Sequence, residues 1–203
     1  DRVAEKVART AGNPYGLERI AFTFVVDKDG EEKVRRRHTW YPREGRVVVE
    51  TDDNRVELSG LLDHDLSKLS VAPDDNAATW KEIAPGESPK DAARAWSQFV
   101  NDSYWLLAPS KVLDEGVDRA LDDEGRLVLT FGKVGLTPGD TYRLTVDHDT
   151  WRITEWEYVL QSGREGAARW TDYAEYGPLT LSTRRVMAQG EMIIQFEDIE
   201  VVP

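Results

Sequence analysis

The sequence predicts a mainly β fold built on one large antiparallel sheet. Short segments with apolar residues at every second position recur along most of the chain, and Gly, Pro, Asn or Asp residues separate them. These segments follow one another without the regularly intervening helices that would indicate a parallel sheet. We count about ten to eleven strands, and an open sheet of that size is expected to curl.

Length and composition indicate a single globular domain over residues 1–203. The chain is 40% apolar and contains seven Trp, seven Tyr and five Phe, whereas a disordered chain would lack these aromatic residues. All-β domains commonly reach this length as one unit. There is no Cys, so disulfides, thiolate nucleophiles and Cys-ligated metals are excluded.

The first sixty residues have the pattern of a helix followed by a β-meander. Residues 2–10 have helical spacing and end at the helix-stopping run Gly12-Asn13-Pro14. Asp29-Gly30 predicts a hairpin turn between two alternating strands. One face of this hairpin carries Ile20, Phe22, Phe24 and Val26 from the first strand, and Arg36, His38 and Trp40 lie on one face of the second. Turns at 42–45 and 53–54 lead into two shorter strands at 47–49 and 56–58.

The middle of the chain lacks the apolar alternation of the first sixty residues. Residues 60–87 are rich in Gly, Asp, Pro and Ser, and predict a long connection that holds one short helix. Ser88, Pro89 and Asp91 are typical of a helix start, and an apolar stripe follows at Ala92, Trp96, Phe99 and Val100. We expect this helix to end near Asn101 or Leu107, before Pro109.

Alternation resumes after Lys111 and continues to the end of the chain. Turn signals such as Glu124-Gly125, Ser162-Gly163 and Gln189-Gly190 separate the segments. The residues that mark the expected strand faces are Leu127, Leu129, Phe131, Tyr142, Leu144, Val146, Trp156, Tyr158, Leu160, Trp170, Leu179, Leu181, Ile194 and Phe196.

The charge balance restricts the class of partner. A formal net charge of −12 argues against nucleic acid and anionic lipid headgroups, because both require a basic face. No apolar run reaches the length of about 18 residues that a membrane-spanning helix needs. Because the chain starts at Asp1 without Met, we expect that a signal segment, a lipid anchor or a trimmed segment preceded it.

Catalytic and metal-binding motifs are weak. Two histidines lie between acids, in Asp63-His64-Asp65 and Asp147-His148-Asp149, and imidazole with carboxylates can hold a metal ion. However, neighbouring residues of a strand point to opposite faces, and Asp-rich turns arise from local hydrogen bonding alone. The sequence has no nucleophile elbow, phosphate-binding Gly-rich loop or His-Glu-x-x-His motif. We therefore predict no catalytic residue, no metal ligand and no cofactor.

Aromatic residues on the expected inner faces are the remaining signal. They either fill the core, as most buried aromatic residues do, or line a concave apolar cavity between the curled sheet and the helix. Physical reasoning leaves both interpretations open. The residues expected to line such a cavity are Phe22, Phe24, Trp40, Trp96, Tyr104, Trp105, Trp156, Tyr158 and Trp170.

Several stretches resemble a family of uncharacterised exported bacterial proteins. They are Trp96-Ser-Gln-Phe99-Val-Asn-Asp102-Ser-Tyr104-Trp105-Leu-Leu-Ala-Pro109-Ser-Lys111, Gly135-Leu-Thr-Pro138-Gly139-Asp140-Thr-Tyr142, Trp156-Glu157-Tyr158, Trp170-Thr-Asp172-Tyr173 and Phe196-Glu197-Asp198-Ile199. The family in turn resembles the LolA/LolB-like superfamily of outer-membrane lipoprotein carriers. This resemblance implies an unclosed half-barrel, with an N-terminal helix and a helical insertion near 89–107 packed on the concave side. It also implies a hydrophobic cavity for acyl chains and a location in the periplasm or on the outer membrane.

Two functional hypotheses follow from these observations. The first is non-catalytic binding of a lipid, a lipoprotein acyl chain or another apolar ligand. The second is an envelope lipoprotein domain that binds a protein partner and holds no internal ligand. Residues 60–87 distinguish them: a segment across the mouth of a cavity would act as a lid, and a projecting one would suit a partner. An enzyme, with Asp63-His64-Asp65 as its site, is the third and least supported class.

Overall fold

The computed structural model describes residues 2–69, 72–131, 139–188 and 190–203. Within them, eleven strands form one antiparallel sheet in the order β4-β3-β2-β1-β11-β10-β9-β8-β7-β6-β5. The strands are β1 Arg19–Lys28, β2 Glu31–Tyr41, β3 Arg46–Glu50, β4 Arg55–Leu58, β5 Val117–Leu121, β6 Leu127–Phe131, β7 Thr141–Val146, β8 Ile153–Val159, β9 Glu165–Tyr176, β10 Leu179–Met187 and β11 Met192–Val202. The helices are α1 Arg2–Ala11, α2 Ala77–Ile83 and α3 Pro89–Lys111, with short 3-10 turns η1 Pro14–Gly16, η2 Pro42–Glu44, η3 Leu61–Asp63 and η4 Leu66–Lys68.

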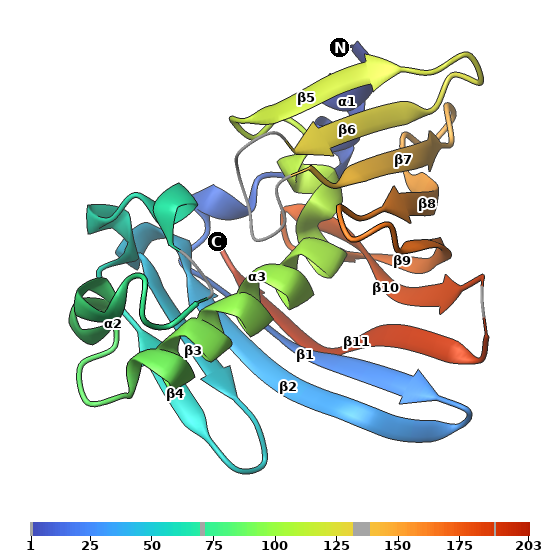
Figure 1. Ribbon diagram of the computed structural model, residues 1–203. Coiled ribbons are helices and arrows are strands. Elements are labelled where there is room, and N and C mark those ends of the chain that lie inside the picture. Colours follow the sequence, from blue (N-terminus) through green and yellow to red (C-terminus); the bar gives the residue numbers. More distant parts are fainter. Residues whose placement is uncertain (1, 70–71, 132–138, 189) are drawn as a thin grey trace.

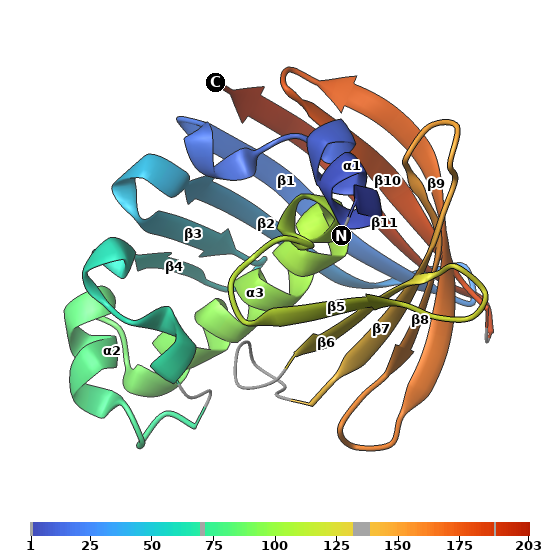
Figure 2. The same ribbon diagram turned by 90° about the horizontal axis from the view of Figure 1, so that it is seen from above.

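The predicted fold class is confirmed, and the topology explains where the long helix lies. The first and last strands, β1 and β11, pair with each other, so the sheet consists of two meanders joined at its centre. The chain leaves the first meander at one edge strand, β4, and enters the second at the opposite edge strand, β5. The connection must therefore pass from edge to edge. It does so as α3, around which the unclosed sheet curves (Figure 1, Figure 2).

The β1–β2 hairpin has the predicted turn and the predicted faces. Asp29 and Gly30 both have positive φ, 56° and 77°, which is the geometry of a tight hairpin turn that matches strand twist. In the paired strands, Phe24 lies opposite Arg36, Phe22 opposite His38 and Ile20 opposite Trp40. Because side chains alternate along a strand, this register aligns the alternating sets of β1 and β2 on a single face of the sheet.

Helix α1 ends where the sequence predicts. Gly12 has φ of 87°, and its amide donates to Ala8 O, as in a left-handed helix C-cap. A Cβ atom at this position would lie 2.2 Å from Pro178 O. Glycine is therefore required both by the backbone angle and by the approach of the β9–β10 turn.

Helix α3 links the two clusters of the hydrophobic core. Its N-terminal half packs with β3, β4 and residues 61–84 through Ala92, Trp96 and Phe99. Its C-terminal half packs with α1 and the second meander through Leu106 and Leu107. Burial of both ends of one helix ties the two meanders together, since apolar burial is the main stabilising term.

The predicted end of α3 is wrong, whereas its predicted start is confirmed. Ser88 Oγ accepts a hydrogen bond from Asp91 N at 3.1 Å, as expected of an N-cap. The helix continues past Leu107 to Lys111 and contains Pro109. Proline cannot donate to the carbonyl four residues earlier, which here is Trp105 O. Arg185 of β10 donates to that oxygen instead, with Nη2 at 2.5 Å, so a tertiary contact permits the helix to continue.

Two further details differ from the sequence expectation. Residues 60–87 hold α2 and two 3-10 turns instead of one short helix. The expected strands also include none at Val117–Leu121, where the structure has β5. Only Val117 of this strand is buried, and its sequence shows no clear apolar alternation. Residues 135–138 of the quoted Gly135–Tyr142 stretch, and Gln189 of the expected turn, lie outside the described residues.

Candidate ligand-binding site

A half-open hollow of about 570 Å³ lies between α3 and the concave face of the sheet. This volume is within the range of ligand pockets, about 300–1,000 Å³. Helix α3 forms one wall, and β1, β2, β6, β7, β8, β10 and β11 contribute the others. The lining residues are Phe24, Val26, Arg36, Ser97, Val100, Asn101, Tyr104, Trp105, Phe131, Asp140, Tyr142, Trp156, Tyr158, Leu160, Arg164, Met187, Met192 and Ile194.

The structure brings some of the sequence-predicted aromatic residues together around this hollow. Those on its wall are Phe24, Tyr104, Trp105, Trp156 and Tyr158. They come from β1, α3 and β8. Their common position follows from two periodicities. Side chains two apart in a strand share one face, and the helix residues that line the hollow, such as Ser97, Asn101 and Tyr104, recur every three to four positions.

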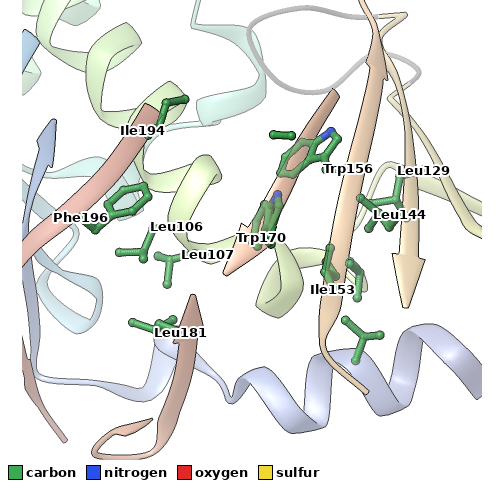
Figure 3. Close-up of a cluster of buried hydrophobic side chains, with 14 of the residues drawn as sticks. Leu106, Leu107, Leu129, Leu144, Ile153, Trp156, Trp170, Leu181, Ile194 and Phe196 are labelled. Atoms are coloured by element: carbon green, nitrogen blue, oxygen red, sulfur yellow. The ribbon is translucent and has the colours of Figure 1, made fainter. Parts of the chain in front are cut away.

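The other predicted aromatic residues lie in packed core beside the hollow. Phe22 contacts the rings of His38 and Phe196, and Trp40 and Trp96 both pack against Phe99. Trp170 stacks on Trp156 at 5.2 Å between ring centroids (Figure 3). The guanidinium of Arg185 lies over the Trp170 ring, with Cζ 3.6 Å from its centroid. Of these four residues, Trp170 supports the wall directly, because it stacks on the lining residue Trp156.

Trp156 is the centre of the aromatic wall. Its ring centroid lies 5.0 Å from that of Trp105, 4.9 Å from Tyr142 and 5.6 Å from Tyr104. Trp156 Nε1 and Tyr104 Oη are covered and have no hydrogen-bond partner among the described residues. A ligand that packs against Trp156 and Tyr104 would therefore meet the faces and edges of their rings rather than their polar atoms.

Tyr158 depends on a glycine that the sequence reasoning missed. Gly166 of β9 lies directly opposite Tyr158 in the β8–β9 pair, and a Cβ atom at Gly166 would lie 2.2 Å from Tyr158 Oη. The ring of Tyr158 thus crosses over β9 at the one position that has no side chain. An isolated Gly inside a strand pattern is a signal of such close approach.

A buried charge cluster flanks the hollow where α3 crosses β2. Asp102 is fully buried and accepts two hydrogen bonds from Arg36, from Nε at 2.7 Å and Nη2 at 2.8 Å. His38 Nε2 lies 2.7 Å from Asp102 Oδ2, and Asn101 Nδ2 donates to Oδ1 at 2.9 Å. Bidentate pairing of this kind has directional as well as electrostatic strength. The cluster fixes the position of α3 over the sheet.

Asp140, a second buried acid at the hollow, also has hydrogen-bond donors for both of its carboxylate oxygens. Asp140 is 1% exposed; its Oδ1 accepts from Gln161 N at 2.9 Å and its Oδ2 accepts from Tyr142 Oη at 3.0 Å. These bonds link the start of β7 to the β8–β9 turn. Sequence reasoning found neither Asp102 nor Asp140 as a site residue, because Arg36 and His38, which pair with Asp102, and Gln161, which pairs with Asp140, are remote in sequence.

The two acid–His–acid motifs have local roles. Asp65 accepts hydrogen bonds from Ser67 and Lys68, and the side-chain hydrogen bond from Lys68 is the main cause that lowers the pKa of Asp65 to about 2. Asp147 accepts the amides of Asp149 and Thr150, which lower its pKa. Both acids therefore cap turns. Among the described residues, no group of three His, Cys, Asp or Glu side chains is placed to hold a metal ion.

The described residues of the 60–87 segment, 60–69 and 72–87, do not line the hollow. Leu61, Trp80 and Ile83 from this segment are buried in the cluster formed with β3, β4 and the first half of α3. The segment thus covers the far end of the sheet (Figure 2). None of the helices in the described part of the chain combines the length and apolar character needed to cross a membrane.

The comparison with solved structures supports this fold. No protein-family model matches the sequence, and no curated protein matches it either. Among solved structures, a LolA superfamily protein from Nitrosomonas europaea superposes with a TM-score of 0.53 at 13% sequence identity, covering 100% of this chain and 93% of that one. A DUF1329 family protein from Desulfovibrio piger gives a TM-score of 0.45 at 10% identity, covering 98% and 90%. The chain has the LolA-like fold that its sequence resemblance implied.

Proposed function

We propose that this chain binds a lipid, an acyl chain or another apolar ligand in the hollow beneath α3, without catalysing a reaction. The observation that carries the proposal is the half-open hollow of about 570 Å³ with its wall of Tyr104, Trp105, Trp156 and Tyr158. Burial of an acyl chain against such a wall contributes about 0.8 kcal/mol per CH₂ group. A short chain segment therefore suffices for measurable affinity.

We further propose that binding takes place in the cell envelope, as in a lipoprotein carrier. The sequence resemblance to exported proteins supports this location, and the LolA-like fold is compatible with it. Large apolar residues exposed in the described part of the chain are Tyr15, Leu62, Leu113 and Leu121, on four different segments. Scattered apolar residues of this kind are normal on a protein surface, so the hollow is the better-supported site.

The first test is native mass spectrometry of the purified protein, followed by unfolding and lipid extraction. We expect a mass adduct that is released on unfolding and partitions into organic solvent. A ligand-free mass, together with no uptake of added hexadecanol, would overturn the proposal and favour the protein-interaction module.

A blocking variant tests the location of the ligand. Ser97 lies on α3 and lines the hollow, so Ser97→Trp should fill part of it and lower affinity for an added alkyl ligand at least tenfold. Arg94→Trp adds the same ring on an exposed position of the same helix and should leave affinity unchanged. Equal affinities of the two variants, measured by titration of tryptophan fluorescence, would contradict binding beneath α3.

A further inference from the structure

The polar lining of the hollow indicates which end of a ligand would be held, and how. Arg36 and Arg164 are the lining residues with a positive charge, and Asp140 is the lining acid among the described residues. Arg36 is already paired through two of its nitrogens with Asp102. Both oxygens of Asp140 accept hydrogen bonds, from Gln161 N and Tyr142 Oη. The guanidinium of Arg36 is therefore already paired with a carboxylate, and the carboxylate of Asp140 would repel an anionic group.

Arg164 differs from these two residues. It is exposed in the turn between β8 and β9, and no ion pair, side-chain hydrogen bond or ring contact joins its guanidinium to a described residue. Its backbone is held in place, because Arg164 O accepts from Leu160 N at 2.9 Å and closes the hairpin. Arg164 therefore combines a backbone held by the hairpin with an exposed guanidinium that has no partner among the described residues, at the edge of an apolar hollow.

We infer that the ligand is a single-chain amphiphile with an anionic headgroup, a carboxylate or a phosphate monoester, whose head pairs with Arg164 while its chain lies along the aromatic wall. This inference rests on the proposed function and adds the class of ligand. Guanidinium binds either oxyanion through charge-assisted, often bidentate hydrogen bonds. The buried Asp140 carboxylate disfavours a second anion deeper in the hollow, so the head is expected at the mouth.

The overall charge of the chain does not oppose this arrangement. A net charge of −12 disfavours docking onto a surface of anionic headgroups, which needs several basic residues. One headgroup at Arg164 responds mainly to charges within a Debye length, about 8–10 Å at physiological ionic strength. A membrane surface and a single bound amphiphile therefore make different demands on the protein.

The test compares four probes with the same sixteen-carbon chain and different heads: hexadecanoate, hexadecyl phosphate, hexadecanol and hexadecylamine. Binding to the full chain is followed by tryptophan fluorescence at low ionic strength. We expect one or both anionic probes to bind at least about tenfold more tightly than hexadecanol, the size of one charge-assisted hydrogen bond. The ratio of hexadecanoate to hexadecyl phosphate then distinguishes a free fatty acid from a phosphate-bearing lipid.

Variants assign the preference to Arg164. Arg164→Gln should remove the advantage of the anionic probes and leave hexadecanol unchanged, while Arg164→Glu should shift the preference towards hexadecylamine. Arg169→Gln is the matched control, because Arg169 is exposed on β9, outside the lining, and has no ion pair among the described residues. It should retain the anionic preference.

The outcomes separate the two levels of the proposal. Equal binding of all four heads, or the same loss of hexadecanol and hexadecanoate affinity in Arg164→Gln, would overturn the headgroup assignment and leave the apolar hollow standing. Failure of every probe to bind would overturn the proposed function as well.

Discussion

Asp102 is the residue whose environment departs most from that of an ordinary helix acid. It lies fully buried in the middle of α3 and its carboxylate meets Arg36 and His38 of β2. A buried ion pair contributes little net stability compared with apolar residues of similar shape, but breaking one leaves an uncompensated charge. The pair therefore acts mainly by specifying how α3 crosses the sheet.

This assignment predicts a specific pattern of stability. Asp102→Asn, which keeps the shape and removes the charge, should lower the free energy of unfolding by about 3–5 kcal/mol. The double variant Asp102→Leu with Arg36→Met should recover most of that loss. Urea denaturation measures the free energy of unfolding of both variants. The control is Asp123→Asn, because Asp123 is exposed and has no ion pair in the described structure. This control should change the free energy of unfolding by less than about 0.5 kcal/mol. A loss below 1 kcal/mol in Asp102→Asn would refute the specifying role.

At the scale of the element, α3 continues past Pro109 because Arg185 of strand β10 supplies a hydrogen bond that the helix itself lacks there. Pro109 removes the donor to Trp105 O, and Arg185 supplies another. Arg185 is itself fully buried and also donates to Ser182 O and Ser182 Oγ through Nη1, at 2.7 and 2.8 Å. Burial lowers the pKa of its guanidinium, and the face of Trp170, at 3.6 Å from Cζ, partly compensates the charge.

A double-mutant cycle tests this relation between Pro109 and Arg185. Arg185→Met should destabilise the wild-type protein strongly, since Trp105 O then remains buried without a donor. In the Pro109→Ala background the restored helix amide can reach that oxygen. We expect Arg185→Met to cost about 1–2 kcal/mol less in that background. Additive effects in chemical denaturation would show that the two residues act independently.

At the scale of the whole molecule, the curvature of the sheet decides where apolar surface is filled and where it is left open. The two edge strands do not meet, and one helix spans the concave side. Side chains at both ends of α3 fill the space against the sheet. The hollow remains next to the middle of the helix, from Ser97 to Trp105.

Closure of this interior also buries tyrosine hydroxyls, which predicts alkaline instability. Burial raises the pKa of Tyr104, and raises that of Tyr173 to about 12. In the unfolded chain a tyrosine ionises near pH 10. The stabilising contribution of the neutral form is therefore complete below about pH 10, and decreases as the pH rises through the folded-state pKa.

We expect the free energy of unfolding to be flat from pH 8 to about pH 10, and then to fall by about 1.4 kcal/mol per pH unit for each such tyrosine. Denaturation curves at intervals of pH, with tyrosine absorbance as a second readout, measure this. Tyr173→Phe should reduce the slope above pH 10. A stability that stays constant to pH 11 would contradict the burial of these hydroxyls.

The sequence by itself determined the local structure and the fold class. Alternation placed Ile20, Phe22 and Phe24 on one face, Asp29-Gly30 formed the predicted turn, and Ser88 capped the predicted helix. These features depend on backbone geometry and on residues within a few positions of each other. For this reason a single sequence sufficed to predict them.

Only the tertiary structure decided which inner residues face the hollow and which polar groups are satisfied. Phe22 and Phe24 share a face and differ by two positions, yet Phe22 packs in the core and Phe24 lines the hollow. Likewise, Asp102 meets Arg36 across 66 positions, and Arg185 reaches Trp105 O across 80. A periodic pattern specifies a face but not what covers it. The path of α3 across the curved sheet supplies that cover, and it depends on contacts between residues far apart in the chain.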